Sequence, residues 1–350
     1  MRIVTIHTSQ HFNKKKDMPS LEEKPFHILA LSGGGFRGLY TATILKQLED
    51  SIGGPLAQHF DLICGTSAGG LLALGLAAEI PTSDLQSMFE QDGKRIFDSR
   101  NLLRRALGSW FKIQAKHSAN GLKDVLTERL GDKTLGDLNH RVLIPAVNCS
   151  TGMGYFFKTP HAETFEVDHR RKVVDVGLAT AAAPTYFPLH RIEEAGVFAD
   201  GGLVGNSPGL FGFHEARYAL RIPVTTTIRV LAIGTMSLGA TIPGAAKLDK
   251  GLFRWGSKIF DLVISTQEKA FDAMLRHSLG ENYYRIDDQV TPDQCQDIAS
   301  LDAVTPGSIN VLKERGAHSA RVTLGDSKFS VFKTHMAAPP AFYHGPNKNQ

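Results

Sequence analysis

The chain has 350 residues, of which 42% are apolar and 21% charged, and its 39 basic and 35 acidic side chains leave a formal net charge of +4. These values are typical of a soluble globular protein, and they exclude disordered, collagenous and coiled-coil classes. The length allows one large α/β domain or about two smaller domains.

The first 25 residues are expected to form a leader outside the fold. They contain a run of three lysines at 14–16 and prolines at 19 and 25, but no apolar segment of the kind that a signal peptide needs. The longest uncharged stretches are two of 17 residues, 62–78 and 230–246, and glycines interrupt both of them. Because a bilayer span needs roughly 20 apolar residues, the sequence predicts no transmembrane helix.

From residue 26 onward, strand and helix signals alternate, which predicts an α/β fold with a mainly parallel central sheet. The expected strands are residues 27–31, 60–64, 141–149 and 228–233. The expected helices are residues 37–52, an Ala- and Leu-rich helix between Gly69 and Pro81, and residues 173–183, 257–279 and 308–322. No linker is evident, so we expect one domain over residues 26–325. Residues 326–350, where proline and polar residues increase, are expected to form a loosely ordered tail.

The first glycine-rich turn, Gly33-Gly34-Gly35, follows the first strand and precedes a helix. With Gly38 it has the spacing of a dinucleotide-binding turn. That fingerprint also needs an acidic residue at the end of the second strand, and Asp61 stands at the beginning of that strand instead. The other interpretation is an oxyanion hole, because successive N–H groups without side chains can face a developing negative charge.

The second glycine turn, Gly65-Thr66-Ser67-Ala68-Gly69, has the GxSxG pattern of a nucleophile elbow. It follows an apolar strand and precedes an apolar helix, which is the context that such an elbow requires. Ser67 is therefore the candidate nucleophile.

The serine hydroxyl needs a base. An α/β-hydrolase triad would take a histidine from the later part of the chain, where the order allows five: His214, His277, His318, His335 and His344. None of them has a distinctive local sequence. Asp200 is the stronger candidate, because a short apolar strand carries it into a turn that continues with Gly201 and Gly202. A carboxylate would need a dry position directly against the serine to act as the base.

These three motifs, in this order and spacing between residues 26 and 208, resemble the signatures of the patatin-like phospholipases. The resemblance implies a three-layer α/β/α fold and a catalytic dyad without histidine. It implies that Ser67 is the nucleophile and Asp200 its base. It also implies that Gly33, Gly34 and Gly35 form the oxyanion hole, with Arg37 beside it.

The size of the chain and residues 271–285 resemble more specifically the CapV-type phospholipases of bacterial antiphage (CBASS) systems. This resemblance implies an enzyme that degrades membrane glycerophospholipids when a cyclic dinucleotide such as cGAMP activates it allosterically. No metal or redox cofactor is expected, and a homo-oligomer is compatible with the sequence. The three distant cysteines (Cys64, Cys149 and Cys295) offer no disulfide framework, which favours the cytoplasm. The resemblance implies action at the inner membrane surface.

Positive charge is concentrated in residues 93–117, which contain seven basic residues and one acidic residue. Within this segment, residues 101–113 can form an amphipathic helix with a basic face and an aromatic edge. Such a helix fits an anionic membrane surface, although a core-packed helix with a solvated basic face explains the pattern slightly better. Nucleic-acid binding is not expected, because no recognised motif accompanies the basic residues.

Two other functions remain open from the sequence. One is an esterase of the α/β-hydrolase type with a Ser-His-Asp triad. The other is a nucleotide-binding module without catalysis, which the glycine spacing of the first turn would allow.

Overall fold

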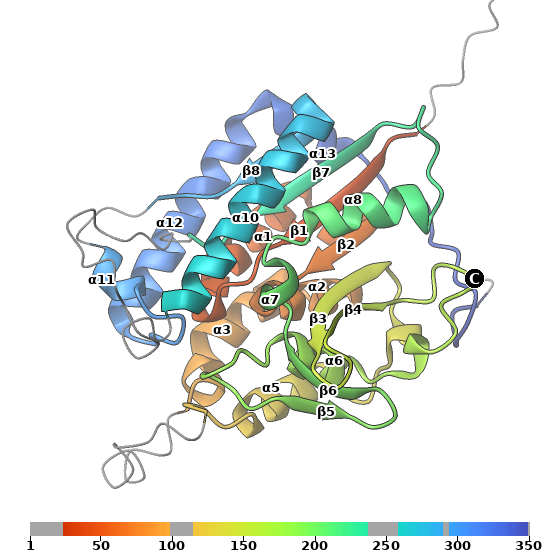
Figure 1. Ribbon diagram of the computed structural model, residues 1–350. Helices are drawn as coiled ribbons and strands as arrows, with labels where there is room; N and C mark the ends of the chain where they lie inside the picture. The colour runs from red at the N-terminus through yellow and green to blue at the C-terminus, as the bar shows by residue number, and fades with distance from the viewer. Residues whose placement is uncertain (1–23, 99–114, 237–257, 290–293, 349–350) are drawn as a thin grey trace, which may run out of the picture.

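A computed structural model describes residues 24–98, 115–236, 258–289 and 294–348 of the chain (Figure 1). Most of the predicted leader, and the whole of the candidate amphipathic helix at residues 101–113, lie outside these described residues.

A sheet of eight strands forms the centre of the described structure. The strands are β1 (Phe26–Leu31), β2 (Leu62–Gly65), β3 (Val142–Asn148), β4 (Met153–Lys158), β5 (His190–Ile192), β6 (Gly196–Asp200), β7 (Ile228–Ile233) and β8 (Tyr283–Ile286). Their order is β5-β6-β3-β2-β1-β7-β8, with β4 paired to β3 off this path. The pairings of β1 with β2 and β7, of β2 with β3, and of β7 with β8 are parallel. The prediction of a mainly parallel sheet is confirmed.

Helices cover both faces of the sheet. They are α1 (Gly38–Ile52), α2 (Ala68–Ala77), α3 (Thr82–Ile96), α5 (Asn120–Leu130), α6 (Val173–Thr180), α7 (Gly202–Gly205), α8 (Gly209–Tyr218), α10 (Lys258–Leu279), α11 (Cys295–Ile298), α12 (Pro306–Gly325) and α13 (Ser330–Thr334). Figure 1 shows α8 and α10 in front of the sheet and α1, α2 and α12 behind it. Within the described ranges, every helix is too short or too polar to cross a membrane.

Successive side chains of the strands pack against helices on opposite faces of the sheet, which explains the three layers. In β1, Ile28 and Ala30 pack with α8 and α10 through Ala216 and Leu275. Leu29 and Leu31 belong to the larger core on the other face, which α1, α2, α3 and α12 complete. Because successive side chains of a strand point to opposite faces, a strand that is apolar at every position must be covered on both sides. The expected three-layer α/β/α arrangement is therefore confirmed.

The expectation of a loosely ordered tail is wrong for residues 326–348. A short 3-10 helix (Ser327–Phe329) and α13 pack against the core, where Phe329 and Phe332 are 2% and 3% exposed. His335 anchors this segment through a 2.8 Å hydrogen bond between its Nε2 and Oδ2 of Asp61. Its proline and polar content hid the aromatic residues that fix it to the N-terminal ends of β1 and β2.

We expect Phe332→Ala to lower the free energy of unfolding by about 3–5 kcal/mol, because truncation of a buried aromatic side chain leaves a cavity. Val322→Ala on α12 is the control, since Val322 is 59% exposed. Urea denaturation measures both variants. Equal small effects in the two would show that the C-terminal segment contributes little to the fold.

Candidate active site

The serine of the GxSxG motif lies in a sharp turn between β2 and α2. Its backbone is in a conformation that non-glycine residues rarely adopt, with φ of 53° and ψ of −125°. The flanking positions 65 and 69 must be glycine because a side chain would clash with neighbouring backbone atoms. A Cβ atom on Gly69 would lie 2.2 Å from the carbonyl oxygen of Leu31, and one on Gly65 would lie 2.2 Å from that of Gly69. The turn thus places Ser67 at the N-terminus of α2, as the motif predicts.

Strand β3 brings the aspartate to this serine. Its first half pairs in parallel with β2, where Cys64 lies opposite Leu143. Its second half pairs with β6 in the antiparallel sense, and Asp200 lies opposite Ala146. Strands β2 and β6 therefore meet end to end beside β3, and residues 133 positions apart in the sequence become neighbours.

The Ser67 hydroxyl donates a hydrogen bond of 2.7 Å to Oδ2 of Asp200. The other carboxylate oxygen, Oδ1, accepts one of 2.7 Å from the N–H of Gly202. Asp200 is 3% exposed, and burial raises its pKa to about 6 although both hydrogen bonds lower it. At neutral pH the carboxylate is therefore ionised, and it is a stronger base than an exposed aspartate.

None of the five candidate histidines is hydrogen-bonded to Ser67 or Asp200 in the described part of the chain. His335 is bonded to Asp61, which precedes β2, whereas Ser67 follows that strand. His344 is bonded to the carbonyl oxygen of Glu163, and His214 stacks on Tyr218. His277 lies in the last turn of α10, and His318 lies in α12. The arrangement is that of a Ser-Asp pair.

The glycine-rich turn lies directly beside the elbow, since a Cβ atom on Gly33 would come 3.1 Å from that of Ser67. The expectation that all three glycines supply N–H donors changes for Gly33, because its N–H donates to the carbonyl oxygen of Asn206 at 3.1 Å. Among the described residues, no backbone carbonyl accepts from the N–H groups of Gly34 and Gly35. The N–H groups of Gly34 and Gly35 are therefore the two donors of this turn without a backbone acceptor in the described part of the chain.

Arg37 stands in the 3-10 helix Gly35–Arg37 that completes this turn. Its backbone N–H donates to the carbonyl oxygen of Gly34 at 3.1 Å. Since the C=O and N–H of a trans peptide point in opposite directions, this bond directs the N–H of Gly35 away from Arg37. Arg37 thus supports the turn through its main chain.

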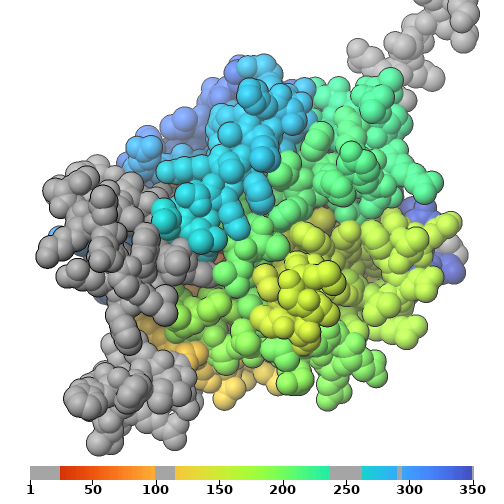
Figure 2. Space-filling model, viewed as in Figure 1, coloured from red at the N-terminus to blue at the C-terminus, as the bar shows by residue number. Residues whose placement is uncertain are grey.

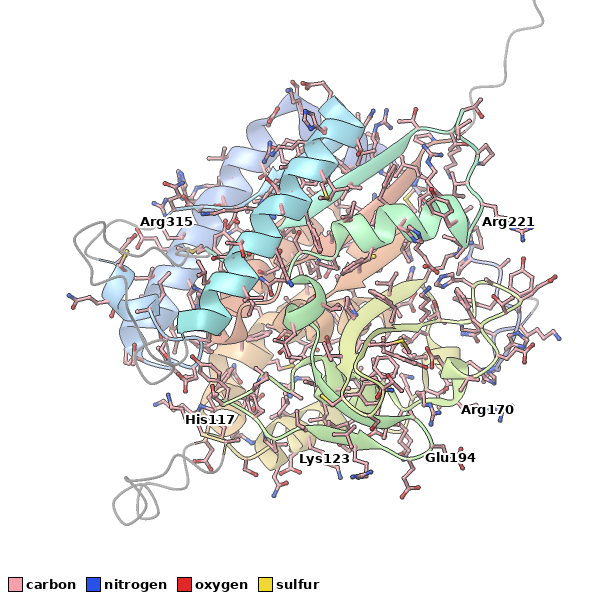
Figure 3. The ribbon with its side chains drawn as sticks, viewed as in Figure 1. His117, Lys123, Arg170, Glu194, Arg221 and Arg315 are labelled. Carbon is pink, nitrogen blue, oxygen red and sulfur yellow. The ribbon has the colours of Figure 1, made fainter. Side chains whose placement is uncertain are left out.

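A polar cluster around the buried Asp302 side chain supports the glycine turn. The N–H of Phe36 donates to the carbonyl oxygen of Leu301 at 2.7 Å. The next residue, Asp302, is bonded to Lys116 and, at 2.5 Å, to His117, which is labelled in Figure 3. Burial raises the pKa of Asp302, but its hydrogen bonds to His117, Lys116 and Ser300 outweigh that effect and hold it well below its usual range. The ionised carboxylate therefore fixes the loop that holds the glycine turn.

Sequence reasoning missed Thr180, which connects the elbow to β3. Its hydroxyl oxygen accepts a hydrogen bond of 3.0 Å from the N–H of Ser67 and donates one of 2.6 Å to the carbonyl oxygen of Pro145. Threonine at the end of an apolar helix carries no sequence signal for such a role. Asn206 and Thr235, which contact Gly33, were missed for the same reason.

We expect Thr180→Val to keep the shape of the side chain but leave the N–H of Ser67 and the carbonyl of Pro145 without their shared partner. The free energy of unfolding should fall by about 1–3 kcal/mol. Activity should fall roughly tenfold to a hundredfold, because Ser67, the candidate nucleophile, loses its alignment. Thr127→Val is the control, since the Thr127 hydroxyl bonds only within the exposed face of α5. Unchanged activity in Thr180→Val would show that Thr180 is not needed to align Ser67.

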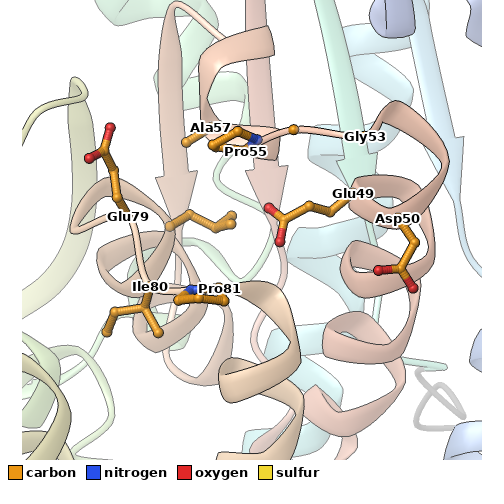
Figure 4. Close-up of a pocket in the computed structure, with 10 residues that line it drawn as sticks. Glu49, Asp50, Gly53, Pro55, Ala57, Glu79, Ile80 and Pro81 are labelled. Atoms are coloured by element: carbon orange, nitrogen blue, oxygen red, sulfur yellow. The ribbon is translucent and has the colours of Figure 1, made fainter.

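A hollow of about 450 Å³ lies at the far end of α2 from Ser67 (Figure 4). Helix α2 has ten residues, which corresponds to a separation of about 15 Å. The residues that line the hollow include three with carboxylates, Glu49, Asp50 and Glu79, and the others carry no charge. Glu49 also accepts hydrogen bonds from Thr82 and from the N–H of Leu56, so it stabilises the local backbone. The negative lining makes this hollow unsuitable for an anionic ligand.

No group of three or more His, Cys, Asp or Glu side chains is arranged to hold a metal ion in the residues that the structure describes.

The α/β/α fold, the nucleophile elbow and the adjacent carboxylate place the chain among the serine hydrolases. The sequence profile of the family described as patatin-like phospholipase matches residues 29–210. The chain belongs to the patatin-like phospholipase family.

Similar proteins include three that are named cGAMP-activated phospholipase. The one from Pseudomonas aeruginosa is 61% identical over 324 residues, covering 93% of this chain and 96% of its own length. The one from Vibrio cholerae is 34% identical, covering 84% of this chain and 90% of its own length. The one from Escherichia coli is 32% identical, with coverages of 89% and 93%.

Proposed function

We propose that this protein is a phospholipase that releases fatty acids from membrane glycerophospholipids through Ser67 and Asp200 when a cyclic dinucleotide activates it. The observation that carries the proposal is the 2.7 Å hydrogen bond from the Ser67 hydroxyl to the buried Asp200 carboxylate at the nucleophile elbow. The names of its similar proteins support the lipid substrate and the activator.

In the first half of the reaction, Ser67 Oγ attacks the ester carbonyl carbon as Asp200 accepts the hydroxyl proton. The carbonyl oxygen becomes an oxyanion, which the N–H groups of Gly34 and Gly35 and the N-terminus of α2 stabilise. When the tetrahedral intermediate collapses, Asp200 returns the proton to the departing lysophospholipid oxygen, and the acyl group stays on Ser67.

In the second half, water attacks the acyl-serine carbonyl as Asp200 accepts a proton from it. Collapse of this second intermediate releases the fatty acid, and the proton on Asp200 returns to Ser67 Oγ. A carboxylate with a pKa of about 6 suits both roles, because it is ionised at neutral pH and its conjugate acid is a competent donor.

Activation by a cyclic dinucleotide such as cGAMP is part of the proposal. It is supported by 61% identity over nearly the whole chain to a protein named for that activator. The resemblance to antiphage phospholipases supports a further part of the proposal, a defensive role in which the enzyme degrades the lipids of its own cell. Action at the inner membrane surface is supported by the excess of basic residues in segment 93–117.

The proposal is tested by measuring fatty-acid release from vesicles of phosphatidylethanolamine and phosphatidylglycerol. We expect release with cGAMP and little release without it. Parallel samples with cUMP-AMP, the activator named for another similar protein from Escherichia coli, examine nucleotide specificity. Nucleotide binding without ester hydrolysis would support the binding-module alternative. Activity that depends on one of the late histidines would support the esterase alternative.

A further inference from the structure

The carbonyl oxygen of Gly33 is held by two side-chain donors from distant parts of the chain. Asn206 donates from Nδ2 at 3.1 Å, and Thr235 donates from its hydroxyl at 2.9 Å. Asn206 also accepts the N–H of Gly33 on its own backbone carbonyl. Asn206 is 4% exposed and Thr235 is fully buried, so water does not compete for these bonds.

These bonds act on the N–H of Gly34. The carbonyl of Gly33 and the N–H of Gly34 belong to one planar trans peptide and point in opposite directions. Two donors on the carbonyl oxygen fix the plane of this peptide. They also draw electron density from its nitrogen, which strengthens the N–H as a donor.

Glu268 determines how the Asn206 amide is oriented. The same Nδ2 donates to Oε2 of Glu268 at 3.2 Å, so both of its hydrogens are used. A carboxylate only accepts hydrogen bonds, and it therefore requires the nitrogen rather than the oxygen of the amide on its side. Glu268 is 4% exposed, and its other oxygen accepts a 2.6 Å bond from Arg285. This ion pair keeps the carboxylate available inside the protein.

Helix α10 carries Glu268 and also supports the segment that follows the aspartate. Gln267 donates from Nε2 to the carbonyl oxygen of Leu203 in α7, at 3.1 Å. Figure 2 shows the α7 region and α10 next to each other on the viewed face, in green and cyan. One helix thus contacts the backbone behind Asp200 and, through Asn206, the glycine turn.

We propose that Asn206, oriented by Glu268, is a positioning residue for the oxyanion hole. It holds the Gly33–Gly34 peptide so that the N–H of Gly34 is presented, with increased polarity, to the tetrahedral oxyanion of a lipid ester. The inference rests on the proposed function. A merely structural Asn206 would affect folding and substrate binding, whereas a positioning residue affects stabilisation of the transition state.

The test uses the full-length protein with cGAMP and a water-soluble short-chain thioester, on which kcat and KM can be separated. The main variant is Asn206→Asp, which keeps the shape but has at most one hydrogen to donate, whereas the amide donates one to Gly33 and one to Glu268. Thr235→Val removes the second donor from the same carbonyl and serves if Asn206→Asp does not fold. Asn148→Asp is the matched control, because Asn148 is 5% exposed and donates its amide to the carbonyl of Ala195 at 3.0 Å, away from the dyad.

We expect kcat to fall roughly tenfold to a hundredfold in Asn206→Asp, with KM changed less than about twofold. Inhibition by a trifluoromethyl ketone, whose adduct with Ser67 carries an oxyanion, should weaken by a similar factor. The kcat of Glu268→Gln should lie between those of the wild type and Asn206→Asp, because the amide oxygen of the new glutamine side chain can still accept a hydrogen bond from Nδ2 of Asn206.

An effect of Asn206→Asp and Thr235→Val no larger than that of Asn148→Asp, or one confined to KM, would overturn the positioning role while leaving the phospholipase intact. A wild-type protein without esterase activity, or activity that survives in Ser67→Ala, would instead overturn the proposed function and this inference with it.

Discussion

Replacing Ser67 with alanine is expected to reduce cGAMP-dependent fatty-acid release by at least about 10³-fold, because removal of the nucleophile leaves only binding and oxyanion stabilisation. The thermal unfolding midpoint should also fall, by an amount that corresponds to about 1–3 kcal/mol, since the variant loses the hydrogen bond from the hydroxyl to the buried Asp200 carboxylate. Release of labelled fatty acid from vesicles and differential scanning fluorimetry measure the two quantities.

The control for this variant is Ser83→Ala, which removes an exposed hydroxyl at the start of α3. A second variant, Ser67→Gly, adds an independent prediction. Because φ is 53° at this position, glycine should relieve backbone strain and give a higher unfolding midpoint than Ser67→Ala, while activity is lost in both. Comparable release by Ser67→Ala and Ser83→Ala would refute the nucleophile assignment.

Asp200→Asn is expected to reduce the rate about 10²–10⁴-fold, because an amide cannot accept the proton of Ser67. In the wild type, kcat should rise with pH through about 6, the pKa to which burial raises Asp200, as the carboxylate loses its proton. Below that value the acid is neutral and the reaction slows. A pH profile measured with a soluble ester, with Asp124→Asn on α5 as the control, tests both statements. A wild-type rate independent of pH between 5 and 8 would contradict the assignment.

The same variant should be more stable than the wild type at neutral pH. The folded protein holds the Asp200 proton up to about pH 6, whereas an unfolded chain releases it near pH 4. Between these values the native state binds more protons, so stability falls as pH rises, by about 3 kcal/mol in total. Asparagine avoids this cost of a buried charge. Urea denaturation at pH 5 and pH 7.5 should therefore show a larger gain for Asp200→Asn at the higher pH.

Sequence reasoning predicted the parts of the site that depend on local geometry. The elbow around Ser67 needs small neighbours in a tight turn, so its residues are recognisable in the sequence. Strand and helix signals alternate along the chain, and strands such as β1 and β7 consist mostly of apolar residues, so the α/β fold with a mainly parallel sheet could be predicted. Asp200 was found because a strand and two glycines frame it.

The features of the site and the fold that the sequence did not predict depend on contacts between distant segments of the chain. Thr180 and Ser67 are 113 residues apart, and Asn206 and Gly33 are 173 apart, so no local pattern records their hydrogen bonds. Gly33 was assigned a free N–H because its partner, Asn206, follows the aspartate motif rather than the glycine turn. The prediction for the C-terminal segment was wrong because it rested on the average composition of residues 326–350. An average does not show that single aromatic residues such as Phe332 pack into the core.

The end-to-end meeting of β2 and β6 beside β3 limits where the chain can change length. Side chains alternate between the two faces of a strand, so one inserted residue in β6 would turn Asp200 away from Ser67 while most of the sheet stayed paired. An insertion between β5 and β6, in residues 193–195, would leave that alignment unchanged. Variants of the first kind should fold and remain inactive, whereas those of the second should tolerate added residues, including a fluorescent label for following membrane encounters.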